Sequence, residues 1–295
     1  MTIYNDLPNA LTVDLEDWYH SVLEVDPANW LRHEDRVAAA TERLLACLAE
    51  RGARATFFVL GHVAERHPDL VPAIEAAGHE IACHGYEHRL VYTLSPNDFR
   101  DDLRRSLHLL RSQAKAPVRG FRAAYWSITR ACPWALDVLA DEGLAYDSSI
   151  YPTRTSLYGV PDAPRGPYRL RAPGGRALLE FPPSVLRLPV RNLPFAGGIY
   201  LRLLPYWFVR WAMRRFRRGG RPALVYIHPP EFDPGKPRLA LPLARRVLHY
   251  ARLDALRVKV PRLLADFAFT TLGALYDRCA ADPKLPVWSL EGWRA

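Results

Sequence analysis

Short apolar runs alternate with amphipathic stretches over the first half of the chain. Five runs have the length and composition of buried strands: residues 10–14, 55–59, 79–83, 118–121 and 144–147. Helical spacing fills the intervals between them: residues 36–51, 61–67, 69–77, 96–113 and 131–142. Gly52, Gly78 and Gly143 follow three of these helices as C-terminal caps. Strands that alternate with helices over short connections predict an α/β fold with a parallel sheet or barrel.

The pattern changes after residue 150. Prolines and glycines crowd residues 151–198, and within them only 168–171 and 177–181 have the pattern of strands. Regular spacing then returns and predicts these elements: a helix at 199–217, a strand at 222–228, helices near 242–250 and 254–265, a strand at 267–269 and a helix near 271–280.

We interpret residues 1–295 as one domain. A core half covers about 8–150, a groove-forming insertion covers about 151–198, and a C-terminal half at about 199–280 completes the fold.

Two of the predicted strands end in residues that suit a metal. Asp14, Glu16 and Asp17 lie at the end of the first strand, and His84 and His88 follow the third. In parallel α/β folds, the carboxyl ends of the strands meet at one edge. Two histidines four residues apart can face one way on a helical turn, and a carboxylate would complete a site for one divalent metal. The alternative is that these are ordinary polar loop residues.

The composition is that of a globular protein, with 49% hydrophobic and 24% charged residues. No apolar run reaches the roughly 18 residues of a membrane-spanning helix. The first residues lack the basic and then apolar pattern of a secretory signal, so a cytoplasmic location is expected. The four cysteines show no paired spacing, which is typical of reduced thiols.

Charge is unevenly distributed. Residues 1–150 hold 15 Lys and Arg against 22 Asp and Glu, whereas residues 151–295 hold 25 against 9. The second half is therefore expected to attract an anionic partner, such as a membrane surface or an acidic glycan. Residues 206–218 mix aromatic residues with arginines, as in helices that lie in a membrane interface. The alternative is a helix that packs on the core with solvated arginines. Nucleic acid is not expected as a partner, since the sequence carries no motif for it.

An ordered set of motifs resembles the polysaccharide deacetylase superfamily, the NodB-homology or carbohydrate esterase family four enzymes. It is most similar to the branch linked to exosortase/PEP-CTERM exopolysaccharide clusters. The motifs span nearly the whole chain: Leu11-Thr12-Val13-Asp14-Leu15-Glu16-Asp17, His84-Gly85-Tyr86-Glu87-His88-Arg89, Gly120-Phe121-Arg122-Ala123, Tyr146-Asp147-Ser148-Ser149-Ile150, Gly197-Gly198-Ile199-Tyr200-Leu201-Arg202 and His228-Pro229-Pro230-Glu231.

This resemblance implies a distorted (β/α)7 barrel that holds one divalent metal, usually zinc in that family. It implies that Asp14 is the general base and that His84 and His88 are metal ligands. The family's usual adjacent pair of aspartates is absent here. Glu16 is therefore assigned as the acidic ligand, and Asp17 is the alternative.

The resemblance also assigns residues around the reacting group. Arg122 would orient the carboxylate of Asp14 and hold it ionised. The backbone N–H of Tyr125 would help to hold the oxyanion, and Trp126 would contribute to substrate binding. Taken alone, Arg122 could equally be a buried ion-pair residue.

The leaving amine requires a proton, and His228 is the implied acid. Asp147 could fix the tautomer of His228 and raise its pKa, although a supporting or sugar-binding role is equally open. Taken singly, His228 at the end of an apolar strand could be a core histidine, and Asp147 could be an ordinary turn residue.

The function implied is a metal-dependent N-deacetylase. Its substrate would be the N-acetylated sugars of an exopolysaccharide or of its lipid-linked precursor, at the inner face of the membrane. Two alternatives remain: a metal-dependent hydrolase of small or cyclic amides, and a catalytically silent glycan-binding scaffold.

Overall fold

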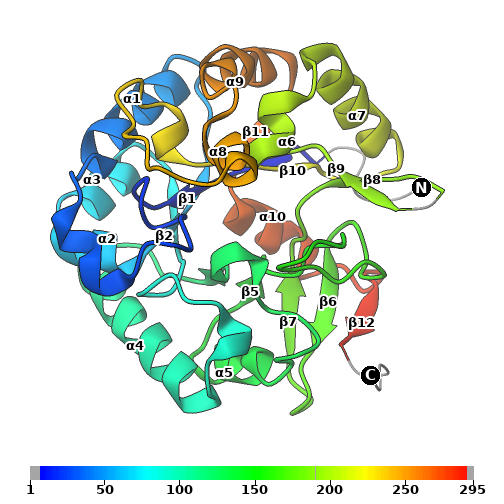
Figure 1. The fold of residues 1–295 in the computed structure, drawn as a ribbon. Coiled ribbons are helices and arrows are strands. Elements are labelled where there is room, and N and C mark those ends of the chain that lie inside the picture. Colours follow the sequence, from blue (N-terminus) through cyan, green and yellow to red (C-terminus); the bar gives the residue numbers. More distant parts are fainter. Residues whose placement is uncertain (1–6, 190, 291–295) are drawn as a thin grey trace.

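The computed structural model describes residues 7–189 and 191–290 as a ring of strands surrounded by helices (Figure 1). The strands of the main sheet are β1 (Asn9–Leu15), β2 (Thr56–Val59), β3 (Glu80–Cys83), β4 (Gly120–Phe121), β5 (Tyr146–Asp147), β6 (Tyr168–Arg171), β7 (Ala177–Glu180), β10 (Leu224–Ile227), β11 (Phe269–Thr270) and β12 (Val287–Ser289). The helices are α1 (Val37–Ala49), α2 (Gly61–Arg66), α3 (Leu70–Ala76), α4 (Pro96–Gln113), α5 (Ala135–Asp141), α6 (Gly198–Leu203), α7 (Tyr206–Arg218), α8 (Leu243–Tyr250), α9 (Asp254–Asp266) and α10 (Leu272–Cys279).

The strand order is that of a distorted barrel. The order is β10-β1-β2-β3-β4-β5-β7-β6-β12, and β11 pairs with β1 beside this path. Neighbours from β10 to β7 run parallel, which gives seven parallel strands, and β6 returns antiparallel to β7. The seven-stranded α/β architecture expected from the sequence is therefore confirmed.

The register of the sheet aligns the ends of the strands. Leu15 of β1 is level with Val59 of β2, which is level with Cys83 of β3, and Cys83 is level with Phe121 of β4. Polar residues that follow these positions in the sequence therefore emerge side by side at one end of the barrel. This alignment is what brings distant segments of the chain together.

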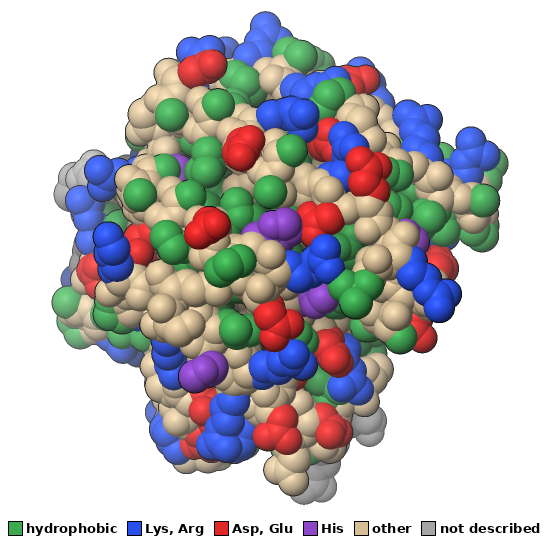
Figure 2. All heavy atoms as spheres, turned by 90° about the vertical axis from the view of Figure 1, so that its left-hand side faces the viewer, with side chains coloured by type: hydrophobic (Ala, Val, Ile, Leu, Met, Phe, Trp, Pro, Cys, Tyr) green, Lys and Arg blue, Asp and Glu red, His purple; other side chains and the backbone are tan. Residues whose placement is uncertain are grey.

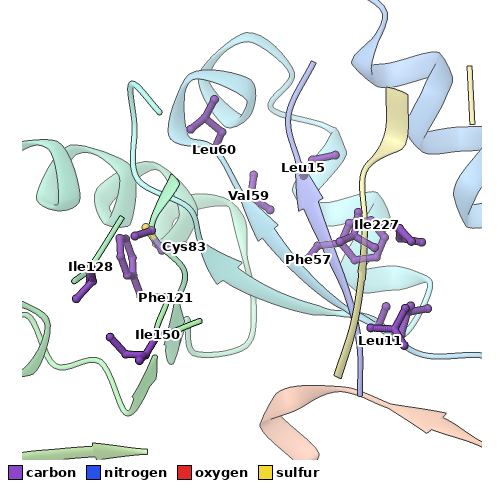
Figure 3. Close-up of a cluster of buried hydrophobic side chains, with 14 of the residues drawn as sticks. Leu11, Leu15, Phe57, Val59, Leu60, Cys83, Phe121, Ile128, Ile150 and Ile227 are labelled. Carbon is purple, nitrogen blue, oxygen red and sulfur yellow. The ribbon is translucent and has the colours of Figure 1, made fainter. Parts of the chain in front are cut away.

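Strand residues alternate between two buried layers. Leu11, Val13 and Leu15 of β1 pack in the layer beneath the surrounding helices, with Phe57, Val59 and Ile227, as Figure 3 shows for the labelled members. Asp14 and Phe58 are also buried, on the opposite faces of their strands. Because both faces of β1 are covered, all seven of its residues are buried, as is usual for parallel sheets.

The second half differs from the prediction at one helix. Residues 199–217 were expected to form a single helix, but α6 ends at Leu203 and α7 begins at Tyr206. Leu204 is extended, with φ −66° and ψ 137°, because a proline disfavours helical geometry in the residue before it. Pro205 then precedes the first turn of α7.

The proline-rich segment contains more regular structure than expected. The strands predicted at 168–171 and 177–181 are present as β6 and β7. The hairpin of β8 (Val185–Arg187) and β9 (Asn192–Pro194) was not predicted. Since β7 is the seventh parallel strand, this segment contributes to the barrel itself. Within residues 7–189 and 191–290, no helix has the length and apolarity that crossing a bilayer requires.

Candidate active site and metal centre

Glu16, His84 and His88 meet at the carboxyl end of the barrel. One ligand atom from each lies within 4.8 Å of the other two, and all three side chains are buried. His88 Nε2 lies 2.7 Å from Glu16 Oε2, within hydrogen-bond distance. Two imidazoles and a carboxylate form a donor set that suits a divalent transition metal, so the residues fit the expected metal.

The charge states of these groups suit a cation. Burial alone would raise the pKa of Glu16, but the charge and hydrogen bond of His88 and the charges of His228 and His84 outweigh it. The pKa of Glu16 therefore lies well below its usual range. Burial lowers the pKa of His84 to about 4, which keeps its imidazole neutral. An ionised carboxylate and a neutral imidazole are the forms that bind metals.

The backbone of β4 orients His84. His84 Nδ1 lies 2.7 Å from the carbonyl oxygen of Arg122. Since a carbonyl only accepts, Nδ1 carries the proton and Nε2 is left as the metal-binding nitrogen.

His84 and His88 do not lie on a helical turn, so that expectation is wrong. The segment after β3 is a loop in which Gly85 has φ +75° and His88 has φ +53°. Asp102 of α4 holds this loop: its Oδ2 accepts the N–H of Tyr86 at 2.8 Å, and its Oδ1 accepts the N–H of Glu87 at 3.0 Å. These side-chain bonds take the place of helical backbone bonds. Asp102 was missed by the sequence reasoning.

Asp17 does not reach the metal-ligand cluster. Its Oδ1 accepts the N–H of Trp18 at 2.6 Å, and its Oδ2 accepts the N–H groups of Arg36 and Val37 at 2.7 and 2.9 Å. The N–H groups of Arg36 and Val37 are at the start of α1, where a helix leaves its first N–H groups without backbone partners. Of the two acidic candidates, the structure places Glu16 in the cluster.

Arg122 holds Asp14 from inside the barrel. Its Nη1 lies 2.5 Å from Asp14 Oδ1 and donates to Thr12 Oγ1 at 3.0 Å, and its Nη2 donates to Ser148 Oγ at 2.9 Å. The guanidinium carbon lies 4.1 Å from the centre of the Phe58 ring. Arg122 is fully buried, so its position is tightly constrained. One oxygen of Asp14 is thereby fixed and the other is directed toward His228.

His228 lies beside Asp14 and the metal-ligand cluster. Its Nε2 lies 3.7 Å from Asp14 Oδ2 and 3.9 Å from Glu16 Oε1, and its Nδ1 lies 3.3 Å from Glu231 Oε2. Burial alone would lower the pKa of His228. The hydrogen bond and charge of Glu231, with the charges of Glu16 and Asp14, raise it to about 9. His228 is therefore protonated at neutral pH, as a proton donor must be.

Asp147 does not contact His228; Glu231 takes the position expected for it. Asp147 Oδ1 accepts the hydroxyl of Ser149 at 2.5 Å, and Asp147 is level with Glu180 in the sheet. Burial and the charge of Asp147 raise the pKa of Glu180 well above its usual value, so the neutral form of Glu180 is favoured in the folded chain. Glu231 lies only three residues after His228, and that proximity was the signal available in the sequence.

Tyr125 and Trp126 line the same cavity as the metal-ligand cluster. Both have positive φ, +52° and +50°, although neither is glycine. Such backbone conformations cost of order 1–3 kcal/mol each and are concentrated at functional sites. The predicted roles of the Tyr125 N–H and of Trp126 in substrate binding stay predictions.

The cavity has a volume of about 190 Å³ and is lined mainly by apolar atoms. Asp14 and His228 open onto it together with the metal-ligand cluster. Its walls are rich in aromatic side chains: Tyr125, Trp126, Tyr158, Tyr200 and Tyr226. A largely apolar pocket with a few convergent polar groups is the usual form of a small-molecule site.

Two family models match consecutive parts of the chain. A polysaccharide deacetylase model matches residues 26–145, and a domain of unknown function (DUF3473) matches residues 148–277. The first match begins after Asp14 and Glu16, so the position of these carboxylates rests on the structure.

Curated relatives match over part of their length. A peptidoglycan deacetylase from Helicobacter pylori is 30% identical over 109 residues, which is 37% of this chain and 36% of the relative. A chitooligosaccharide deacetylase from Sinorhizobium fredii is 34% identical over 109 residues, which is 36% of this chain and 48% of the relative. The chain therefore spans less than half the length of these relatives.

A solved structure matches nearly end to end. A crystal structure from Mycobacterium smegmatis, assigned as a polysaccharide deacetylase, is 24% identical with a TM-score of 0.65. The likeness covers 98% of this chain and 96% of that chain. At this level of identity the likeness shows that the fold is shared.

Proposed function

Since the chain belongs to the polysaccharide deacetylase superfamily, we propose that it is a metal-dependent N-deacetylase of N-acetylated sugars. One observation carries the proposal. Asp14, His228 and the cluster of Glu16, His84 and His88 open onto one cavity. A base, an acid and a metal site within one cavity are what amide hydrolysis requires.

Bound at Glu16, His84 and His88, a divalent cation such as zinc would polarise the acetyl carbonyl and lower the pKa of water. Asp14 accepts the proton of the attacking water, and the ion pair with Arg122 keeps that carboxylate in place. The new C–O bond replaces the C–N bond, which gives acetate and a free amine.

The amine is a poor leaving group until it is protonated. His228 donates this proton from Nε2, the nitrogen that faces Asp14 and Glu16. Glu231 holds the ring by its other nitrogen, Nδ1, and keeps the imidazole protonated. The Tyr125 N–H is proposed to hold the developing oxyanion.

We further propose that the substrate is an exopolysaccharide or its lipid-linked precursor, as in the exosortase-linked branch that the motifs resemble. The aromatic walls suit the apolar faces of sugar rings. Leu157 and Tyr158 of the proline-rich segment line the cavity, which supports a groove-forming role for residues 151–198.

A peripheral membrane contact through residues 206–218 is part of this proposal. On α7, Trp207 and Trp211 are 69% and 47% exposed, and Arg214, Arg215 and Arg218 are exposed beside them. Figure 1 shows α7 at the right edge of the molecule, whereas the opposite face in Figure 2 carries interspersed acidic and basic side chains. Exposed tryptophans with arginines suit an anionic lipid surface.

Vesicle sedimentation tests the membrane contact. We expect the chain to sediment with phosphatidylglycerol vesicles and not with phosphatidylcholine vesicles. Replacing both Trp207 and Trp211 by alanine should reduce that binding. Equal sedimentation of the wild-type chain and the double variant would contradict the contact. Fractionation of gently lysed cells tests the predicted location of the protein at the inner face of the membrane.

Acetate release tests the activity. We expect acetate from N-acetylated chito-oligomers, loss of turnover with a chelator, recovery with Zn²⁺, and loss in His84→Ala. Hydrolysis of small or cyclic amides without acetate from glycans would favour the small-amide hydrolase instead. Glycan binding by a metal-loaded chain that releases no acetate would favour the catalytically silent scaffold.

A further inference from the structure

Cationic side chains line one side of the cavity. Lys236 lies in the segment between β10 and α8, and Arg245 and His249 lie on α8, four residues apart and therefore on one helical face. All three line the cavity that contains Glu16 and His84. The wall made by Lys236, Arg245 and His249 is called the cationic wall below.

The carboxylates of the cavity already have partners. Asp14 pairs with Arg122 at 2.5 Å, Glu16 Oε2 lies 2.7 Å from His88, and Glu231 accepts from the backbone N–H of His228 at 3.0 Å. Each of these carboxylates thus has a polar partner within the site, although the charges of Glu231 and Glu16 also act on Lys236.

The cations of the cavity differ in how they are paired. Arg202 donates to the carbonyl oxygens of His249 and Ala251, both at 3.1 Å, and so has a structural role. Arg245 pairs with Glu24 at 2.8 Å. Lys236 forms no ion pair with the described carboxylates; its ammonium lies 5.7 Å from the centre of the Tyr250 ring.

His249 connects the two cations. Burial and the neighbouring charges of Lys236 and Arg245 lower its pKa to about 4, so its imidazole is neutral. Its Nε2 is buried and has no hydrogen-bond partner among the described residues. Burial also lowers the pKa of Lys236, to about 8, yet leaves it mostly protonated at neutral pH. A half-buried ammonium group without an ion-pair partner among the described residues and a buried imidazole nitrogen thus lie on one wall.

We propose that the cationic wall binds an anionic group, a phosphate or a carboxylate, carried by the N-acetylated substrate. Lys236 makes the main contact, and His249 Nε2 and Arg245 contribute. The inference rests on the proposed deacetylase function, because the acetamido group of the same molecule would lie at Asp14 and His228. It narrows the substrate class to acidic amino sugars, in which the acid and the acetyl group are bound in one cavity.

Calorimetric binding to the full chain tests this subsite. Three probes are compared: N-acetylglucosamine 1-phosphate, N-acetylmuramic acid and the neutral methyl N-acetylglucosaminide. We expect at least one acidic sugar to bind about tenfold or more tightly than the neutral one. Raising NaCl from about 50 to about 500 mM should weaken only the acidic sugars. The phosphate and carboxylate probes show which anion the wall accepts.

Variants show whether Lys236 causes the preference for acidic sugars. Lys236→Met should remove most of the preference for acidic sugars, and Lys236→Arg should retain most of it. Lys115→Met, at an exposed site outside the cavity, should bind as the wild-type chain does. Titrations with and without added Zn²⁺ show whether an anion binds to the metal instead, because the preference due to Lys236 should persist without Zn²⁺. Thermal melting confirms that each variant is folded.

Three results would overturn the proposal: no measurable binding of either acidic sugar, equal affinity for acidic and neutral sugars, or a preference that survives in Lys236→Met. Its failure is distinguishable from failure of the deacetylase function, which is measured separately as acetate release. A preference for acidic sugars without acetate release would retain the subsite and reject the catalysis. Acetate release without any preference for acidic sugars would retain the catalysis and reject the subsite.

Discussion

At the scale of single residues, the environment of each acidic side chain decides its role. Glu16 and Asp17 are adjacent in sequence, yet one lies with two imidazoles and the other receives the N–H groups that begin α1. Glu231 contacts His228, whereas Asp147 is buried beside Glu180. Residue type and position at the end of a strand predicted which residues were candidates. The role of each candidate depends on its hydrogen-bond partners, which only the folded chain shows.

Glu231→Gln tests the control of His228. Removing the carboxylate's charge should lower the pKa of His228 from about 9 toward its ordinary value. Because a proton donor works only below its pKa, the alkaline limb of the kcat profile should move to lower pH by about one unit or more. At about pH 8.5 a shift of one unit, from about 9 to about 8, corresponds to a loss of roughly threefold, and a larger shift to a larger loss. Profiles of acetate release against pH measure the shift.

Glu50→Gln is the matched control, since Glu50 is exposed at the end of α1. Its alkaline limb should coincide with that of the wild-type chain. An unshifted limb in Glu231→Gln would show that Glu231 does not set the protonation of His228.

Glu180→Gln tests whether the pKa of the buried Glu180 carboxyl is raised in the folded chain. The folded-state pKa of Glu180 is raised, so ionisation favours the unfolded chain increasingly as the pH rises above the ordinary glutamate pKa of about 4.5. Glutamine cannot ionise and can donate to Asp147. The melting temperature of the variant minus that of the wild-type chain should therefore be larger at about pH 8 than at about pH 5.

Melting curves at the two pH values make this measurement. Glu42 lies at an exposed position of α1. The melting temperature of Glu42→Gln should differ from that of the wild-type chain by the same amount at both pH values. If Glu180→Gln behaved in that way too, the pKa of Glu180 would not be raised in the folded chain.

At the scale of elements, the pattern of apolar residues predicted most strands and helices. It did not predict the conformation of the loops that position the side chains of the site. The ends of β1 and β3 could be placed because apolar runs stop there. The positive φ values of Gly85 and His88 could not be predicted, since this loop is held by hydrogen bonds to Asp102, which lies 15 and 16 residues further along the chain than Glu87 and Tyr86. The break at Pro205 was visible in the sequence and was missed.

Asp102→Ala tests the clamp. Without its carboxylate, the N–H groups of Tyr86 and Glu87 lose their acceptors and the loop that carries His88 loosens. We expect Zn²⁺ affinity to fall by about 10–100-fold, as for other groups that support metal ligands. Competition with a chromogenic chelator measures it. Asp101→Ala, at the exposed neighbouring position of α4, should retain wild-type affinity. Equal Zn²⁺ affinity in both variants would mean that Asp102 does not position the ligands.

At the scale of the whole molecule, the site forms because of the register in which neighbouring strands of the barrel pair. Residues from β1, from the loop after β3, from the end of β4 and from the end of β10 converge because the parallel strands end level with one another. The alternation of strands and helices predicted this architecture, and the ordered motifs predicted which strand ends matter. The cationic wall was not predicted. It combines Lys236 with a face of α8, and only the folded chain brings them to the cavity.

The central claim is that Asp14 acts as a base beside a metal that Glu16, His84 and His88 hold. The most direct measurement compares acetate release and bound Zn²⁺ in the wild-type chain and in Asp14→Asn. We predict that the variant binds about one equivalent of Zn²⁺ but loses at least about a hundredfold in kcat, as expected for removal of a general base. Undiminished turnover in Asp14→Asn, or a wild-type chain that binds no Zn²⁺, would contradict the account.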